Sequence, residues 1–169
     1  MKNKNRKQVR YLSYAGVIAA LYVALTYFSA ILGLSGTNAV QLRLSEALCV
    51  LPYFTAAAVP GVTIGCLVAN LVTGAALPDI IFGTLATLIG AVGTRLLRRS
   101  RILAVLPPIL SNTIIVPFVI RYAYMNVTES LPFLFFTVGL GEVLSVGLVG
   151  TLLLLALEPR RAHIFPESL

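Results

Sequence analysis

Charged side chains are scarce in this sequence, and acidic ones are the scarcest. Only 11% of the 169 residues are charged, and six residues are acidic, whereas 58% are hydrophobic and the mean hydropathy is +0.92. A water-soluble domain could not bury that much apolar surface. We therefore expect an integral membrane protein, with one membrane domain over residues 1–169.

Motifs for catalysis and for metal binding are missing as well. The chain has no GxxxxGK[ST] phosphate loop, no HExxH and no GxSxG, and its one histidine, His163, lies in the C-terminal tail. The two cysteines, Cys49 and Cys66, lack a CxxC spacing and fit small packing residues inside helices. We expect no enzyme, cofactor or metal site. Uphill transport would then need an ion gradient or another subunit as its energy source.

Long apolar runs are present, and they predict an all-α bundle of six transmembrane helices. A span needs about 20 predominantly apolar residues. The predicted spans are 11–33, 42–58, 60–75, 79–97, 103–122 and 131–157. The second and third spans nearly touch, but we count them separately because Pro60 lacks the N–H that a helix interior needs.

Lysine and arginine are distributed unevenly between the two sides that six spans define. Eleven of them lie in the two tails and in the turn after the fourth span, whereas the opposite side receives only Arg43 and Arg121. Because cytoplasmic segments collect Lys and Arg, we expect the tails 1–10 and 158–169 in the cytoplasm. The net charge of +7 then reflects topology and attraction to anionic lipid, not nucleic-acid binding.

Polar side chains within the predicted spans gather at similar depths. At about 1.5 Å per residue, Glu46, Asn70 and Asp79 fall in the outer half of the membrane, and Asn112 and Glu142 near its middle. The inner half has no Lys or Arg between the helix ends. This distribution predicts an outward-facing pocket that is closed at its base.

Most of these residues also have a purely structural interpretation. Asp79 begins a helix, where a carboxylate is favoured by the helix dipole whatever the ligand. Asn70 and Asn112 can form interhelical hydrogen bonds. Arg43 and Glu46 are three residues apart and can pair with each other.

Glu142 is harder to explain structurally, because no cation is near it in the sequence. Two aromatic residues, Tyr53 and Phe82, accompany the acidic positions and are candidates for stacking on a ligand. Carboxylates beside aromatic faces would suit a planar ligand rich in N–H donors, or one that carries an amine, and would repel an anion.

The block QLRLSEALCVLPYFTAAAVPGVTIGCLVANLVTG at 41–74, followed by DIIFGTLATLIGA at 79–91, resembles the QueT family of queuosine-precursor transporters. The resemblance runs over roughly residues 9–158. It implies the six-helix fold of a substrate-binding S component of an energy-coupling factor (ECF) transporter in the cell membrane. It further implies an extracellular lid at 34–43, a pocket for a 7-deazaguanine compound, and partners: a transmembrane coupling subunit and two cytoplasmic ATPases.

The resemblance implies lid or pocket roles for part of the candidate site, whereas Asn112 and Glu142 rest on depth alone. The expected substrate-binding residues are Gln41, Arg43, Glu46, Tyr53, Asn70, Asp79, Phe82, Asn112 and Glu142. S components also resemble one another in an Ala-xxx-Ala pattern on the first helix, here Ala15 and Ala19, which contacts the coupling subunit through small residues.

Two other functions remain open on the sequence. The first is an S component of the same fold that binds a vitamin or another purine-like base. The second is a stand-alone proton-coupled carrier in which Glu142 and Asp79 titrate. Such a carrier would want an inverted repeat between its halves, and we see none.

Overall fold

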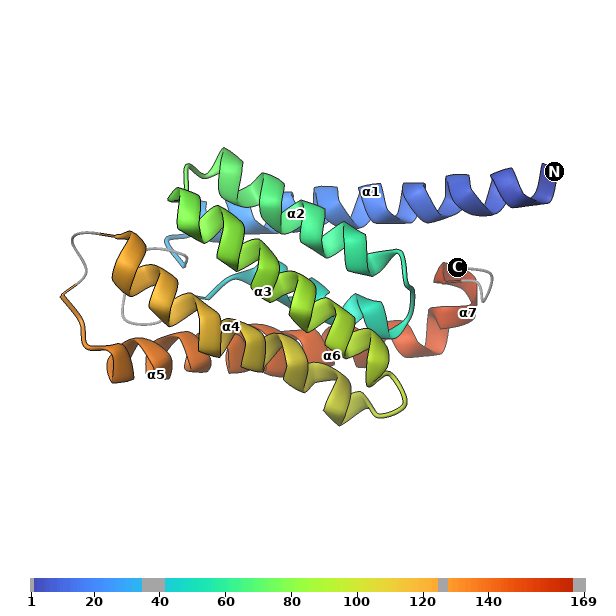
Figure 1. The fold of residues 1–169 in the computed structure, drawn as a ribbon. Helices are drawn as coiled ribbons and strands as arrows, with labels where there is room; N and C mark the ends of the chain where they lie inside the picture. The colour runs from blue at the N-terminus through green and yellow to red at the C-terminus, as the bar shows by residue number, and fades with distance from the viewer. Residues whose placement is uncertain (1, 35–41, 125–127, 166–169) are drawn as a thin grey trace.

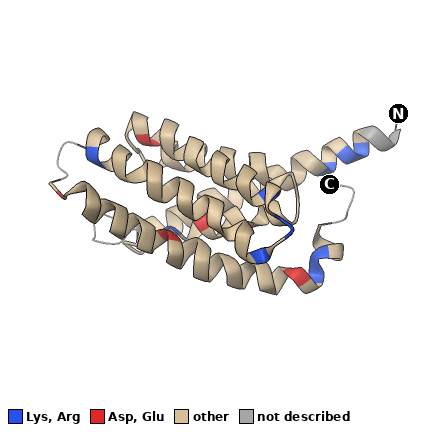
Figure 2. Ribbon diagram, turned by 60° about the horizontal axis from the view of Figure 1, so that its bottom comes forward, with Lys and Arg blue, Asp and Glu red and all other residues tan. Residues whose placement is uncertain are grey.

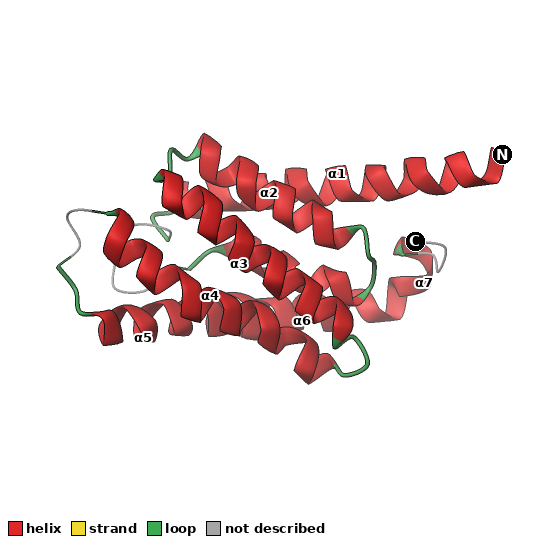
Figure 3. Ribbon diagram, in the orientation of Figure 1, coloured by secondary structure: helices red, strands yellow, loops and turns green. Residues whose placement is uncertain are grey.

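The described chain forms one elongated helical bundle. The computed structural model describes residues 2–34, 42–124 and 128–165, and among these residues it contains helices and loops but no strand (Figure 3). The long helices run side by side, and both ends of the described chain lie at the same end of the bundle (Figure 1). The helical architecture confirms the expectation of a helical membrane protein.

Some of the helices are long and apolar enough to cross a membrane, and others are shorter. The long apolar runs among the described residues are Asn5–Ile31, Leu77–Leu96, Arg101–Ala123 and Leu131–Ile164. The elements in chain order are α1 (Lys2–Ile31), η1 (Leu44–Tyr53), α2 (Ala58–Val72), α3 (Leu77–Leu96), α4 (Arg101–Ala123), α5 (Leu131–Glu142), η2 (Val143–Gly150), α6 (Thr151–Leu157), η3 (Glu158–Arg160) and α7 (Arg161–Ile164). The second and third predicted spans correspond to the shorter elements η1 and α2, so a count of six spans stays a prediction.

Helices α1 and α2 approach closely through pairs of small residues. A Cβ at Gly61 would lie 3.0 Å from the carbonyl oxygen of Ala15, and one at Gly65 would lie 3.1 Å from the Cα of Ala19. Small residues at this spacing let two helix backbones come together. Helix α2 therefore packs against Ala15 and Ala19, and their predicted contact with a coupling subunit stays a prediction.

Element η1 is a 3₁₀ helix of ten residues inside the bundle, with residues 45–52 buried. It packs against α1, α3 and the π-helical element η2. A 3₁₀ helix advances about 2.0 Å per residue, compared with about 1.5 Å in an α-helix. The stretched geometry lets this short segment run through the core and places Glu46, in its first turn, among the other helices.

The last helical run, Leu131–Ile164, changes its geometry immediately after Glu142. There α5 ends and η2 begins as a π-helix, a rare form that is often found at functional sites. At its far end η2 lies tightly against η1, since a Cβ at Gly150 would lie 2.9 Å from Cγ1 of Val50. The two irregular helices thus pack against each other, with Glu46 inside η1 and Glu142 at the end of α5 directly before η2.

The C-terminal segment folds back onto the end of the bundle that holds both termini (Figure 1). The ring of Phe165 stacks on Phe54, with centroids 5.2 Å apart and planes 5° from parallel. The hydroxyl of Tyr14 in α1 donates to the carbonyl oxygen of Ile164 at 2.5 Å. This segment therefore joins α1 to the turn that follows η1.

Lys and Arg residues gather toward that same end of the bundle, whereas several acidic residues lie along the helices (Figure 2). The gathering includes the turn between α3 and α4, where Arg98, Arg99 and Arg101 follow one another closely. The predicted cytoplasmic location of both tails depends on this asymmetry, and the orientation itself stays a prediction.

Candidate functional site

Two buried carboxyl groups from distant parts of the chain meet inside the bundle. Glu46 in η1 and Glu142 at the end of α5 are 3% and 9% exposed. Between them lies Asn112 of α4, whose Nδ2 is 3.3 Å from Glu46 Oε2 and 3.1 Å from Glu142 Oε1. An amide nitrogen carries two hydrogens, so this one group can donate to both carboxylates. The structure thus brings Asn112 and Glu142, which the sequence places near the middle of the membrane, together with Glu46, which it places in the outer half.

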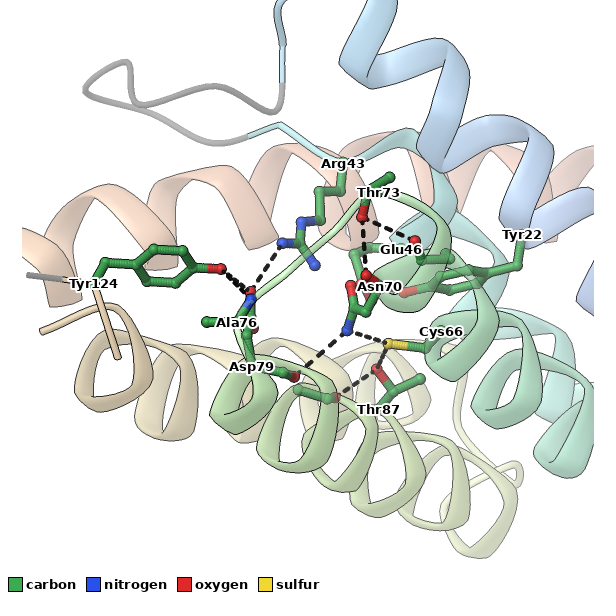
Figure 4. Close-up of polar contacts among 12 residues, drawn as sticks. Tyr22, Arg43, Glu46, Cys66, Asn70, Thr73, Ala76, Asp79, Thr87 and Tyr124 are labelled. Carbon is green, nitrogen blue, oxygen red and sulfur yellow. Dashed lines mark hydrogen bonds and ion pairs between the residues drawn. The ribbon is translucent and has the colours of Figure 1, made fainter. Parts of the chain in front are cut away.

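Glu46 receives further donors from α1 and from its own helix. The hydroxyl of Tyr22 donates to Oε1, and the Sγ of Cys49 lies 3.3 Å from Oε2. Tyr22 is among the largest fully buried side chains, and its ring points toward Glu46 in Figure 4. Sequence reasoning missed Tyr22, which is the contact that ties the first helix to the site.

Tyr22 belongs to a polar stripe on α1 that fixes the start of η1. Thr26 lies one turn further along α1, and its hydroxyl is hydrogen-bonded to that of Ser45 at 2.8 Å. Ser29 follows, and its oxygen accepts from the backbone N–H of Leu44 at 3.0 Å. These three polar residues recur at helical spacing within an apolar span, and that repeat was the signal available in the sequence.

A small cavity adjoins the two carboxyl groups. Its volume is about 20 Å³, and its lining includes Glu46, Asn112, Glu142, Arg43 and Thr87. A water molecule needs about 10–15 Å³ on this measure, so the cavity has room for about one water. A bicyclic base is several times larger, and the helices around the cavity would have to separate to admit one.

A second polar cluster centres on Asp79 in the first turn of α3. Asp79 Oδ2 accepts from the hydroxyl of Tyr124 at 2.9 Å and lies 3.9 Å from Nη2 of Arg43. Figure 4 shows both side chains pointing toward Asp79. The N-cap of α3 is Ala76, without a side-chain cap. The structure therefore gives the Asp79 carboxylate these side-chain partners, and Arg43 forms its ion pair with Asp79 and not with Glu46.

Asn70 lies beside the cavity without being part of its lining. Its Nδ2 is 3.5 Å from the backbone oxygen of Asp79 and 3.6 Å from Sγ of Cys66, which itself lines the cavity and accepts from Thr87. These long contacts connect α2 to α3. The geometry fits the interhelical role that the sequence left open for Asn70.

The structure places the two aromatic candidates away from the cavity. Phe82 is 48% exposed and lines an apolar groove of about 310 Å³ between α3 and α4. The ring of Tyr53 packs edge-on against Phe54 at 5.1 Å. In the three-residue repeat of a 3₁₀ helix, Tyr53 is turned away from Glu46, whereas α-helical spacing would align them. Neither ring lines the cavity beside Glu46, so stacking of these rings on a ligand stays a prediction, and Gln41 lies outside the described residues.

We expect Tyr124→Phe to weaken the cluster around Asp79 by about 1.5–3 kcal/mol, the range for a hydrogen bond to a charged group. Burial, and then Asp79, raise the pKa of the Tyr124 hydroxyl, so it remains a donor at neutral pH. Thermal unfolding in detergent measures the change. Tyr122→Phe is the matched control, because Tyr122 is 78% exposed. Equal effects of the two substitutions would contradict the prediction.

A strongly apolar helical chain with a buried polar cluster between its helices defines a helical membrane protein with an internal polar site. A family model described as QueT transporter matches residues 12–159, which is most of the chain. The chain belongs to the QueT transporter family, so it is a membrane transport protein with a small-molecule substrate. No curated protein and no solved structure matches it.

Proposed function

We propose that this protein is the substrate-binding subunit of an ECF transporter and captures a queuosine precursor of the 7-deazaguanine type from outside the cell. Family membership supports transport. The observation that carries the choice of ligand is the pair of buried carboxyl groups that share the amide of Asn112. A guanine-like edge offers adjacent ring and exocyclic N–H donors, which a carboxylate accepts in pairs.

Energy for import would come from partner subunits. The sequence has no phosphate loop, so ATP hydrolysis belongs to cytoplasmic ATPases that act through a transmembrane coupling subunit. Both tails are cytoplasmic in this proposal, and the chain crosses the membrane six times. Release of the ligand then requires that the complex has a second state of lower affinity.

Entry of the ligand requires the site to open, because the present cavity holds about one water. We propose that the segment 34–43 acts as a lid. The backbone N–H of Leu42 donates to the carbonyl oxygen of Leu34 at 2.9 Å, which brings the two ends of the segment together. Arg43 follows directly and reaches Asp79. We propose that movement of this segment exposes Glu46 and Glu142 to the outside.

A different face of α1 is available for the coupling subunit. Gly16, Ala20 and Ala24 are exposed and lie beside the covered Ala15 and Ala19. We expect Gly16→Leu together with Ala20→Leu to abolish uptake, because bulky side chains prevent close helix approach. Ligand binding by the isolated subunit should stay intact, and Val17→Leu, at an exposed neighbour, serves as the control. Normal uptake by the double variant would refute the assignment of this face to the coupling subunit.

The decisive experiment combines binding with uptake. Purified protein is titrated with 7-deazaguanine precursors, queuine and a panel of vitamins, and uptake of a labelled precursor is measured in cells with and without the coupling subunit and ATPases. The proposal expects binding of deazaguanines and uptake that depends on the partners. Binding of a vitamin alone would favour another S component. Uptake without the partners that a protonophore stops would favour a proton-coupled carrier.

A further inference from the structure

A second hollow lies on the side of the bundle and shares no lining residue with the polar cavity. It is the apolar groove of about 310 Å³ between α3 and α4, two helices that run side by side (Figure 1). Its eight lining residues include Phe82, Ile114 and Phe118, and none of the eight is charged. These three are 48%, 56% and 44% exposed, so the groove opens outward. In a membrane protein such a surface faces the hydrocarbon of the bilayer.

The groove is about as long as one leaflet of a bilayer. Its lining on α4 extends from Ile114 to Ala123, the last residue of that helix. Nine steps of about 1.5 Å give about 14 Å, and one leaflet of a hydrocarbon core of about 30 Å measures about 15 Å. On α3 the lining begins at Pro78, in the first turn. The groove therefore starts at the level of the helix ends and stops near the middle of the membrane.

The end of the groove at the helix termini has the chemistry of a membrane interface. Tyr122 lines the groove there and is 78% exposed. Tyrosine is enriched at the level of the lipid headgroups. Arg121 is exposed and lies three residues after Phe118, on the same side of α4. A guanidinium can bind a phosphate through two parallel hydrogen bonds. The groove thus offers an apolar surface to a hydrocarbon chain and a cation at the level of the headgroup.

We propose that this groove binds one phospholipid of the adjoining leaflet, with an acyl chain between α3 and α4 and the phosphate at Arg121. A transmembrane helix of another protein or of a second copy would need a complementary surface along the whole of α4, whereas the hollow stops about halfway. The bound chain contacts Pro78, which directly precedes Asp79. It also contacts Ala123, which directly precedes Tyr124, the hydrogen-bond donor to Asp79. The lipid supports the cluster around Asp79, whatever ligand the polar site takes.

The sequence has no tryptophan, so one introduced tryptophan reports on one position. Phe82→Trp places it in the groove. Phe136→Trp is the matched control, because each residue lies five positions after the start of its helix, and Phe136 is 68% exposed outside the groove. Both full-length variants are reconstituted in vesicles of phosphatidylglycerol with brominated acyl chains, which quench tryptophan on contact, and are then transferred to lipid-free detergent.

Fluorescence should recover at least about tenfold more slowly in Phe82→Trp than in Phe136→Trp, because burial of two methylene groups already changes an affinity about tenfold. Equal recovery would overturn the inference. A tryptophan at position 82 that stays unquenched in the vesicles of a dimeric protein would show that a second copy fills the groove, and would overturn it as well. Wild-type protein after the same transfer should retain one phospholipid per chain in a phosphorus assay, and none retained would contradict the site without reference to any variant.

Two arginine variants test the headgroup contact in the Phe82→Trp protein. Arg121→Gln should speed the recovery about fivefold, the effect of one cation beside anionic lipid. Arg99→Gln removes an exposed cation from the turn at the opposite end of α4 and should leave the recovery unchanged. An unchanged rate in Arg121→Gln, or equal effects of the two substitutions, would overturn the contact between Arg121 and the phosphate.

Discussion

Replacing Asn112 with leucine is expected to lower the free energy of unfolding by about 3–5 kcal/mol and to abolish ligand binding. Leucine has the same branched shape and the same number of side-chain heavy atoms, so the substitution leaves no cavity. The substitution removes the one amide that donates to both Glu46 and Glu142. Taking away the partner of a buried charged group is costly because that group has lost water without gaining a substitute. Thermal unfolding of the purified protein in detergent reports the loss as a lower Tm.

Asn70 provides the matched control for this substitution. It is buried to a similar degree and lies in α2, but its amide makes long contacts to a sulfur and a backbone oxygen. Asn70→Leu should therefore cost about 0.6 kcal/mol, the average for an interhelical hydrogen bond in a membrane. Equal losses for the two leucine variants would show that the Asn112 amide does not hold the carboxylates.

A double-mutant cycle separates the charge effect from other consequences. The leucine of Asn112→Leu leaves two carboxylates without their amide donor. Adding Glu142→Gln removes one of these two carboxylates. Part of the lost stability should return, so the combined loss should be smaller than the sum of the single losses. Simple additivity would indicate that Asn112 and Glu142 act independently.

Gly90→Ala is expected to be strongly damaging although it adds only one methyl group. A Cβ at Gly90 would lie 2.6 Å from the Cα of Pro108, a backbone atom that no rotamer change can move away. Helices α3 and α4 must separate to accept the methyl group. We expect a net cost of about 1–3 kcal/mol, the usual penalty for overpacking, despite the higher helix propensity of alanine. Asn112 lies one turn beyond Pro108, so ligand affinity should fall as well.

The control for Gly90→Ala is the same substitution at a glycine that has no close neighbours. Gly16 in α1 has nothing within 4 Å of the position where a Cβ would lie. Gly16→Ala should therefore raise stability by about 0.5–1 kcal/mol, because glycine loses more backbone freedom on folding than alanine does. Thermal unfolding of both variants measures the difference, and a stabilised Gly90→Ala protein would refute the close packing of α3 on α4.

Depth along the predicted spans anticipated part of the centre of the site. An estimate of rise per residue placed Asn112 and Glu142 near the middle of the membrane and Glu46 in its outer half, and the structure brings both carboxyl groups within hydrogen-bonding distance of Asn112. Depth succeeds here because a polar group inside an apolar bundle needs a partner at its own level.

Direction around a helix axis was harder to predict than depth. Tyr53 was expected to face Glu46, but η1 is a 3₁₀ helix and turns it elsewhere. Ala15 and Ala19 form a small-residue pattern on one helix, and such a pattern does not say which neighbour covers it. The structure shows that the neighbour is α2. Neither arrangement could be predicted from one span, because packing between segments selects the helix geometry and the buried face.

The π-helical element that follows Glu142 sets the rotation between the helical segments before and after it, and a substitution of side chains does not change that rotation. A π-helix holds more residues in each turn than an α-helix does, so the length of η2 sets the rotation of α5 relative to α6. Deleting one residue between Glu142 and Gly150 would turn α5 by about 100° against α6. The carboxylate would then leave the cavity although every side chain of α5 was unchanged. In this segment, insertions and deletions change the site more than exchanges of side chains.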